Sequence, residues 1–368
     1  MNVLNINLNF DVSSLYKNLS EHLKINGCNF KIYYPVLRNR DISKYKDVEY
    51  LDIDKCLNKY DRILFFYRSR KLLKNIEKKY DLNEFNLIHA HSLFSNGYIA
   101  YKLNKKFGIP YIVAVRNTDV NLFFKKIFYL RKIGINILRN AKKIIFISNS
   151  YKNYTIDKYI PNKFRQDINN KSIVLPNGID DFWFDNEFSN KNIKNMCKEI
   201  NLLYVGIINK NKNLIATLKA CDLLIQDGYS VKYTVIGNNL DNEIFNEVNS
   251  KNYVNYLGSM QKEELIKYYR MNDIFIMPSI TETFGLSYVE AMSQSLPIIY
   301  TKGQGFDGFF DDGVVGYSVD SNNYTEIKDR IIKIMKDYQN ISKNCVNCYK
   351  EFNWNDISKQ YIKLYNEI

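Results

Sequence analysis

The chain has 368 residues, of which 46% are hydrophobic, so it is long enough for two globular domains that each bury a core. Its 52 Lys and Arg residues outnumber its 39 Asp and Glu residues, and the net charge of +13 favours anionic partners: nucleotide diphosphates, acidic lipids or nucleic acid. The six cysteines do not form the framework of a secreted disulfide protein, and no run of 18 apolar residues predicts a membrane span.

The N-terminal stretch reads as a strand, a helix and a second strand. Residues 2–10 alternate before a polar turn, residues 15–23 place apolar side chains at helical spacing, and residues 28–34 form the next strand. This stretch lacks the basic region and the continuous apolar run of a signal peptide. We therefore expect an α/β fold that begins with a βαβ unit and a protein that works in the cytoplasm.

The same rhythm returns over residues 87–115, where a strand, a helix and another strand follow each other. His89 and His91 lie two residues apart on the first of these strands, so they share one face, and this spacing suits a metal ion. A third ligand is not evident. We therefore predict no metal site, and we expect His91 to line a cleft and His89 to belong to the core.

Arg116 and Asp119 follow the last of these strands, in the sequence VAVRNTDVN. An arginine can hold a phosphate through two parallel hydrogen bonds and stays charged at every relevant pH, but it cannot act as a base. Arg116 is therefore suited to binding a phosphate and not to accepting a proton.

Residues 121–143 mix aromatic and aliphatic side chains with lysines and arginines. A basic amphipathic helix of this composition can lie on an anionic membrane surface, where each cation contributes about 1 kcal/mol. The pattern fits equally a helix that covers the sheet and keeps its charges in water. Both interpretations stay open, and the first would place the protein peripherally on the inner face of the plasma membrane.

A domain boundary is predicted near residue 180. Residues 173–180 read IVLPNGID, a strand that ends in Pro-Asn-Gly turn chemistry, and the Asn- and Lys-rich residues that follow suit a linker. The predicted segments are an N-terminal domain (1–180), a linker (181–200), a second domain (201–345) and a terminal helix (346–368).

The second half opens with a strand at residues 201–207 and an amphipathic helix at residues 213–226. The loop between them contains Gly206, Lys210 and Lys212. Lysines in a polar loop are usually just solvated, but cations opposite the start of a helix can neutralise a diphosphate. We predict that this loop contacts phosphate.

The most informative stretch is DIFIMPSITETFGLSYVEAMSQSLPII, residues 273–299. An apolar strand ends at a proline, a polar turn follows, and a helical pattern begins near Leu286. Glu282 lies just before the helix and Glu290 about one turn inside it. The amides of Phe284, Gly285 and Leu286 can hold a diphosphate at the helix start, while the two carboxylates bind sugar and ribose hydroxyls.

This stretch resembles the E-x7-E signature of the retaining GT-B glycosyltransferases of family four. The resemblance implies two Rossmann-like domains whose parallel sheets face a central cleft, with the terminal helix packed back on the N-terminal domain. It also implies that Glu282 and the helix amides hold sugar and phosphate, that Glu290 binds ribose, and that no metal or other cofactor takes part.

Two departures from the family pattern concern charged residues. Lys212 matches the lysine of the family's G-R-x-x-x-x-K loop, but Ile207 stands in the arginine's place, and Lys210 is a candidate substitute. Arg116 stands where the family commonly has the histidine of H-G-x-D, and Asp119 matches the acid. The resemblance therefore implies that Arg116 binds the donor phosphate or the acceptor, with Asp119 in the same cleft, and that Arg116 does not act as a general base.

The resemblance implies transfer of a hexosyl or N-acetylhexosaminyl group, with retention, from a nucleotide sugar, most simply a UDP sugar. The acceptor would be a saccharide, with a lipid-linked one favoured, in the biosynthesis of a surface polysaccharide such as capsule, O-antigen or exopolysaccharide. The rivals are another GT-B enzyme, such as a nucleotide-sugar epimerase or an α-glucan synthase, and a non-catalytic protein that binds membrane or nucleic acid. No nucleic-acid-reading motif is apparent in the sequence, so we expect no nucleic-acid partner.

Overall fold

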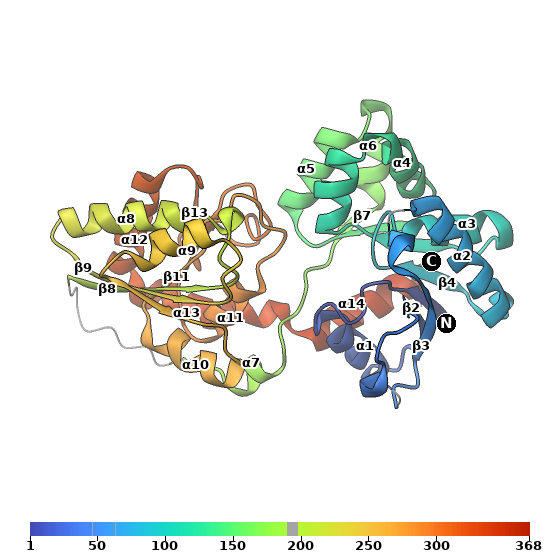
Figure 1. The fold of residues 1–368 in the computed structure, drawn as a ribbon, viewed down its shortest axis with the longest axis horizontal. Helices are drawn as coiled ribbons and strands as arrows, with labels where there is room; N and C mark the ends of the chain where they lie inside the picture. The colour runs from blue at the N-terminus through green and yellow to red at the C-terminus, as the bar shows by residue number, and fades with distance from the viewer. Residues whose placement is uncertain (46, 63, 190–197) are drawn as a thin grey trace. The chain divides into compact units, whose positions relative to one another are not determined.

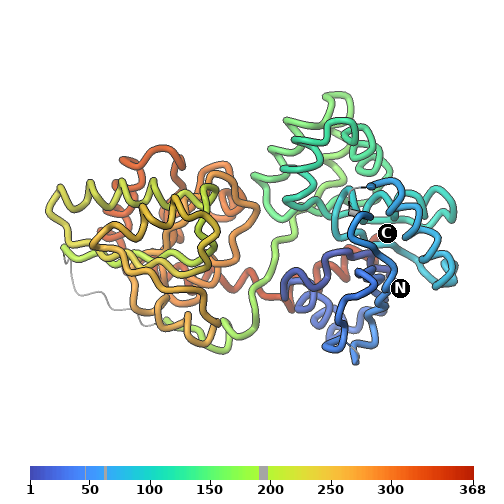
Figure 2. The backbone as a smooth tube through the Cα atoms, in the orientation of Figure 1, coloured from blue at the N-terminus to red at the C-terminus, as the bar shows by residue number. Residues whose placement is uncertain are grey.

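The computed structural model describes residues 1–45, 47–62, 64–189 and 198–368 (Figure 1). The chain divides into two compact units. The first unit comprises residues 1–147, 152–176 and 354–368, and the second comprises residues 148–151 and 177–353. The chain therefore passes from one unit to the other near residue 176 and returns after residue 353, and its course is traced in Figure 2.

The first unit is built on a parallel sheet of seven described strands, in the order β3-β2-β1-β4-β5-β6-β7. The strands are β1 (Asn2–Ile6), β2 (Asn29–Leu37), β3 (Leu51–Leu57), β4 (Leu87–Ala90), β5 (Tyr111–Ala114), β6 (Lys143–Phe146) and β7 (Ser172–Val174). The helices are α1 (Leu15–Ile25), α2 (Phe65–Lys79), α3 (Gly97–Phe107), α4 (Arg131–Asn140), α5 (Asn149–Tyr159), α6 (Asn162–Lys171) and α14 (Trp354–Asn366). Short helical turns are η1 (Ser43–Tyr45), η2 (Lys59–Arg62), η3 (Leu82–Glu84), η4 (Asp119–Phe124) and η5 (Phe128–Leu130).

Helices α1 and α14 lie side by side against one face of this sheet (Figure 1). Leu19 and Leu23 of α1 and Trp354 and Tyr361 of α14 are buried together with apolar side chains of β1, β2, β4 and β5. The side-chain amide of Asn26 also donates hydrogen bonds to Asn355 Oδ1 at 2.9 Å and to Ser358 Oγ at 2.8 Å. The last helix of the chain is therefore part of the first unit's core.

The second unit is built on a parallel sheet of six described strands, in the order β10-β9-β8-β11-β12-β13. The strands are β8 (Glu199–Val205), β9 (Ser230–Ile236), β10 (Val254–Leu257), β11 (Ile274–Ile276), β12 (Ile298–Thr301) and β13 (Gly316–Val319). The helices and turns are α7 (Phe182–Asp185), η6 (Lys210–Lys212), α8 (Leu214–Gln226), α9 (Asn242–Asn249), α10 (Lys262–Met271), α11 (Leu286–Ser293), α12 (Tyr324–Lys336), α13 (Tyr338–Cys348) and η7 (Tyr349–Phe352). Helices α8, α9 and α12 cover one face, and α10, α11 and α13 cover the other (Figure 1). The predicted α/β class, with two Rossmann-like units built on parallel sheets, is confirmed.

The single basic helix predicted across residues 121–143 is wrong. The chain instead forms the π-helical turn η4, then η5, and only then the α-helix α4. Between the two turns, the backbone of Ile127 leaves the helical region at φ −102° and ψ 63°. Phe124 faces inward, against the rings of Phe94 and Tyr159 at 5.1 and 5.2 Å between centroids, and Arg131 Nε donates to the Phe124 carbonyl at 2.6 Å. The aromatic residues that suggested a lipid-facing stripe are therefore divided between the core and the surface.

Part of the predicted linker, residues 190–197, lies outside the described residues, and residues 182–185 form α7. No described helix is both long and apolar enough to cross a membrane.

Candidate functional site

The predicted strand, turn and helix at residues 273–299 are present as β11, a loop and α11. Tyr288, in the first turn of α11, donates its hydroxyl to the Met277 carbonyl at 2.5 Å and so ties the helix to the end of the strand. Gly285 precedes α11 in the left-handed region at φ 83°, and a Cβ there would lie 2.4 Å from the Tyr288 ring. Only glycine fits this close approach without displacing the ring.

The start of α11 presents unused backbone donors. Among the described residues, no acceptor lies within hydrogen-bond distance of the amide N–H of Phe284, Gly285 or Leu286. The first amides of a helix point out of its N-terminus and carry a partial positive charge. This end of α11 can therefore receive an anion.

Lys212 and Glu282 meet beside this helix start. Lys212 Nζ donates to Glu282 Oε2 at 2.6 Å, and the two side chains are only 17% and 13% exposed. Glu282 Oε1 accepts from the amide of Thr283 at 2.9 Å, so both oxygens of the carboxylate accept a hydrogen bond that orients it. The structure thus brings together two predicted site residues that lie 70 positions apart in the chain.

Gly206 directly follows β8, beside Gly237, which directly follows the neighbouring strand β9. A Cβ on Gly237 would lie 1.9 Å from the Gly206 carbonyl oxygen, so the strand ends touch through their backbones. Beyond Gly206, the hydroxyl of Tyr204 donates to the Ile207 carbonyl at 2.7 Å. The loop that carries Lys212 therefore leaves the sheet on a fixed path.

Lys210, predicted as a substitute for the missing arginine, lies apart from this pair. Its Nζ contacts Glu243 Oε2 at 2.9 Å, and both side chains are well exposed. The structure gives no support to the prediction that Lys210 faces the donor phosphates, because its charge is directed at α9 instead.

Glu290 lies inside α11, half-buried, and does not contact Glu282. Its Oε2 accepts from the hydroxyl of Tyr269 on α10 at 3.1 Å. Burial raises the pKa of the Glu290 carboxyl to about 7, although the Tyr269 hydrogen bond opposes the shift. The ion pair between Lys262 and Asp180, at 2.6 Å, is close enough to influence the same carboxyl. Glu290 therefore titrates near neutral pH.

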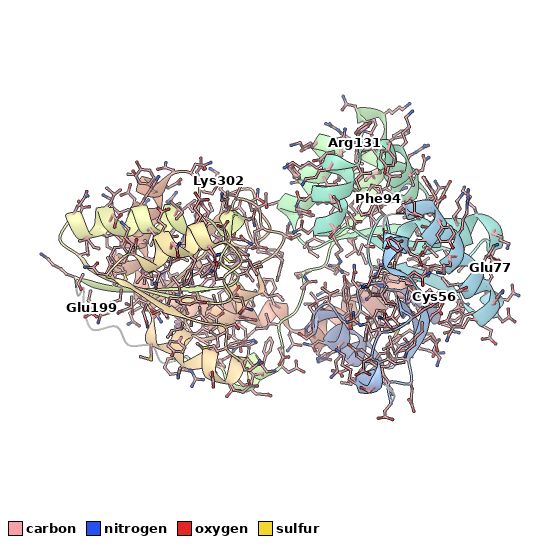
Figure 3. The ribbon with its side chains drawn as sticks, in the orientation of Figure 1. Cys56, Glu77, Phe94, Arg131, Glu199 and Lys302 are labelled. Atoms are coloured by element: carbon pink, nitrogen blue, oxygen red, sulfur yellow. The ribbon has the colours of Figure 1, made fainter. Side chains whose placement is uncertain are left out.

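Arg116 and Asp119 lie in the first unit, after β5. Arg116 Nε donates to the His91 carbonyl at 3.4 Å, and the guanidinium lies 5.8 Å from the centre of the Tyr16 ring. The buried carboxylate of Asp119 accepts from the amides of Leu93, Phe94 and Arg116 at 2.9 to 3.0 Å. Phe94 is labelled in Figure 3. Asp119 therefore fixes a backbone turn, and the geometry gives no support to its predicted contact with an acceptor.

His89 on β4 and His91, directly after the end of this strand, are both buried. His91 Nε2 lies 2.9 Å from Asn5 Oδ1, and His89 Nδ1 lies 2.8 Å from the Tyr365 hydroxyl on α14. Burial lowers the pKa of His89 to about 3 and that of His91 well below its usual value, so both rings are neutral at physiological pH. His89 belongs to the core as predicted, whereas His91 is correctly placed at the strand end but does not line an open surface.

Three further residues complete the neighbourhood. Asn211 and Gln304 hold the turn that carries Glu282, and Tyr269 holds Glu290. Asparagine and tyrosine are abundant throughout the chain, so neither stood out.

Two family descriptions match most of the chain. Residues 12–181 match "Glycosyltransferase Family 4" and residues 185–351 match "Glycosyl transferases group 1". An uncharacterised 41.2 kDa protein in the cps region of Klebsiella pneumoniae is 30% identical over 69% of this chain and 71% of its own length. The alpha-monoglucosyldiacylglycerol synthase of Acholeplasma laidlawii is 24% identical over 70% of this chain and 68% of its own. The capsular polysaccharide biosynthesis glycosyltransferase CapM of Staphylococcus aureus is 28% identical over 54% and 53%.

Solved structures show the same fold over the whole chain. The sucrose-phosphate synthase of Thermosynechococcus elongatus superposes with a TM-score of 0.77 at 17% identity, covering 100% of this chain and 98% of that one. Anabaena HepE in complex with UDP-glucose superposes with a TM-score of 0.69 at 15% identity, covering both chains completely. With its paired parallel sheets and these matches along its length, the chain belongs to glycosyltransferase family 4 and has the GT-B fold.

Proposed function

We propose that this glycosyltransferase moves a hexosyl or N-acetylhexosaminyl group, with retention of configuration, from a UDP sugar to a saccharide acceptor. A lipid-linked acceptor in surface polysaccharide biosynthesis fits best. The UDP-glucose complex of a structural relative supports the donor class, and relatives named for capsular polysaccharide biosynthesis and for a glucosyldiacylglycerol support the acceptor class.

The donor diphosphate binds at the start of α11. The observation that carries this assignment is the convergence of Lys212, Glu282 and three unused amides at one end of a helix. Lys212 can turn from Glu282 to the diphosphate, and Glu282 is then released to accept hydrogen bonds from sugar hydroxyls. Positive charge placed where the leaving diphosphate gains negative charge lowers the barrier to breaking the sugar bond, and such electrostatic stabilisation is usually the largest part of catalysis.

Glu290 binds the ribose of the donor. An ionised carboxylate accepts two hydrogen bonds from a diol, and the Tyr269 hydroxyl keeps the Glu290 side chain in one orientation. Because ribose binding favours the ionised form and the free carboxyl has a pKa of about 7, donor affinity should rise with pH through neutrality.

Arg116, in the first unit, binds phosphate or the acceptor through its permanently charged guanidinium. In the second unit, Lys212 and the α11 amides neutralise the diphosphate without a metal ion. Turnover that is unchanged by EDTA supports this assignment, and turnover that is restored only by added Mg²⁺ or Mn²⁺ contradicts it.

The acceptor binds in a cavity of the first unit. This cavity, of about 520 Å³, is lined by the loops that follow β1, β2 and β3 and by residues 118–130. Its lining includes aromatic and charged side chains, among them Asp11, Arg40, Phe65, Arg68, Phe123 and Tyr129. Carbohydrate rings pack on aromatic faces while their hydroxyls bond to charged groups, so this lining suits a saccharide.

Exposed aromatic residues next to the cavity lining suit a lipid-linked acceptor. Phe128 and Tyr129 are 71% and 67% exposed, and the exposed Phe66 and Tyr67 begin α2. The Phe65 and Phe123 rings, 6.1 Å apart, both line the cavity. The exposed Lys125 and Lys126 lie in the same segment as Phe128 and Tyr129. Aromatic side chains flanked by lysines bind the interface of an anionic bilayer, so the predicted membrane contact is proposed here for a broken segment rather than one helix.

A screen of UDP sugars for release of UDP tests the proposal. One donor should be hydrolysed slowly by the protein alone and faster with a lipid-linked saccharide, and the product should keep the anomeric configuration of the donor. Inverted product would refute retention. Absence of UDP release from every donor, together with steeply salt-dependent binding to a nucleic-acid duplex, would instead favour a non-catalytic binding protein.

A further inference from the structure

The turn of residues 280–283 presents Glu282 to Lys212, and one side of this turn is fixed by Asn211. Asn211 Oδ1 accepts from the amide of Thr281 at 3.1 Å and from its hydroxyl at 2.5 Å, and Asn211 Nδ2 donates to the Thr281 carbonyl at 2.8 Å. The backbone adds a fourth bond, from the Ile280 amide to the Asn211 carbonyl at 2.8 Å. One asparagine side chain thus satisfies every polar group of Thr281.

The other side of the turn is fixed by the loop after β12. Gln304 Oε1 accepts from the Glu282 amide at 3.1 Å, and the Gly305 amide donates to the Glu282 carbonyl at 2.8 Å. A Cβ on Gly305 would lie 2.2 Å from the carbonyl carbon of Thr283, so this loop is packed directly against the turn. Lys302, at the start of the loop, is labelled in Figure 3.

These contacts bear directly on the ion pair. Asn211 is the residue before Lys212, and Thr281 is the residue before Glu282. The hydrogen bonds between Asn211 and Thr281 therefore fix the backbone positions from which the side chains of Lys212 and Glu282 extend. Lys212 receives a further restraint from Asn209, whose Oδ1 accepts from the Lys212 amide at 3.1 Å.

We propose that Asn211 and Gln304 are positioning residues of the donor site, which clamp the 280–283 turn from two sides and set Glu282 and Lys212 in register with the start of α11. This inference rests on the proposed donor-binding role of Lys212 and Glu282. It has particular weight in this chain because Ile207 stands where the family resemblance places an arginine. With one cation fewer near the diphosphate, the placement of Lys212 matters more.

The clamp is tested by kinetics of UDP-sugar hydrolysis. A displacement of about 1 Å in a reacting constellation can lower the rate about 100-fold, so Asn211→Ala should lower kcat/KM about 100-fold. Gln304→Ala removes one bond and should lower it about 10-fold. Asn249→Ala, at the exposed end of α9, is the matched control and should match the wild type.

A gentler pair of variants guards against misfolding of Asn211→Ala. Thr281→Val removes the hydroxyl that donates to Asn211, whereas Thr281→Ser keeps it. Thr281→Val should lower kcat/KM about 10-fold, whereas Thr281→Ser should keep most of the wild-type value. The melting temperatures of the two variants and the wild type should agree within a few degrees. Equal activity of the Val and Ser variants would overturn the clamp.

A double variant separates positioning from general stabilisation. If Asn211 acts through Lys212, Asn211→Ala should cost little further activity in a Lys212→Met background, because coupled residues are not additive. Equal fold losses in both backgrounds would show that Asn211 acts elsewhere and overturn the inference. If the wild-type protein releases UDP and the Asn211 and Gln304 variants do so at the same rate, the clamp alone is refuted. If the wild-type protein turns over no donor, the proposed function is refuted.

Discussion

Replacing Glu290 by glutamine should make the protein more stable at alkaline pH and weaker at binding its donor. Burial raises the pKa of this carboxyl from 4.5 to about 7. Between these pH values the folded protein keeps a proton that the unfolded chain has already released, so the free energy of unfolding falls as pH rises through this window and is level above it. At 1.36 kcal/mol for each pKa unit, the loss reaches about 3 kcal/mol above pH 7.

Glutamine cannot ionise, and its amide oxygen can still accept from Tyr269, so Glu290→Gln avoids this loss. The free energy of unfolding of Glu290→Gln minus that of the wild type should therefore be about 3 kcal/mol larger at pH 8 than at pH 4. Donor binding should change in the opposite sense. A hydrogen bond to a charged group contributes about 1.5–3 kcal/mol, so UDP should bind about 10- to 100-fold more weakly at pH 8.

Urea denaturation at the two pH values and calorimetric titration with UDP measure both effects. Glu247→Gln, exposed on α9, is the matched control and should alter neither quantity. An unfolding free-energy difference that is the same at pH 4 and pH 8 would refute the burial of the Glu290 charge. Unchanged UDP affinity would remove ribose recognition from Glu290.

Three further substitutions address other contacts. Lys212→Met should lower kcat for UDP-sugar hydrolysis about 100- to 1,000-fold, as loss of a charge-stabilising donor does, and a rate within threefold of wild type would contradict its role. Gly305→Ala should lower both the melting temperature and the hydrolysis rate, because its Cβ would overlap Thr283; if the crystal structure of the variant keeps the turn in place, the contact is not restrictive. Asp119→Asn should lower the unfolding free energy by about 2–3 kcal/mol in urea titrations, because an amide nitrogen would face a backbone donor that the carboxylate now accepts; unchanged stability would show that the turn tolerates this.

The sequence was sufficient to predict the parts of the site that are local in the chain. The apolar run, proline and helical spacing of residues 273–299 predicted β11, the loop and α11, because each is determined by neighbouring residues. Side-chain pairing over long separations was not accessible. Nothing in the spacing of Lys212 and Glu282 indicates that they form an ion pair, since their meeting depends on β8 and β11 lying side by side in the sheet.

The prediction of a single helix failed at residues 121–143, where more than one choice of aromatic side chains could face the core. Residues 121–143 are rich enough in aromatic side chains to suggest one amphipathic helix, yet Phe124 turns inward while Phe128 and Tyr129 remain exposed. Which aromatic turns inward is decided by Phe94 and Tyr159, which come from distant parts of the sequence. Asp119 matched a family position, and its hydrogen bonds with the amides of Leu93 and Phe94 could not be predicted from the sequence because they join residues about 25 positions apart.

The position of α14 has a consequence for how the protein is made. The first unit lacks Trp354, Tyr361 and the rest of this helix until residues 354–368 emerge from the ribosome, by which time the whole second unit has been synthesised. A nascent chain that stalls in the second half would expose the apolar surface of β1, β2 and α1 to chaperones and proteases. Because each unit is assembled from separate stretches of the chain, a single proteolytic cut cannot release either one intact.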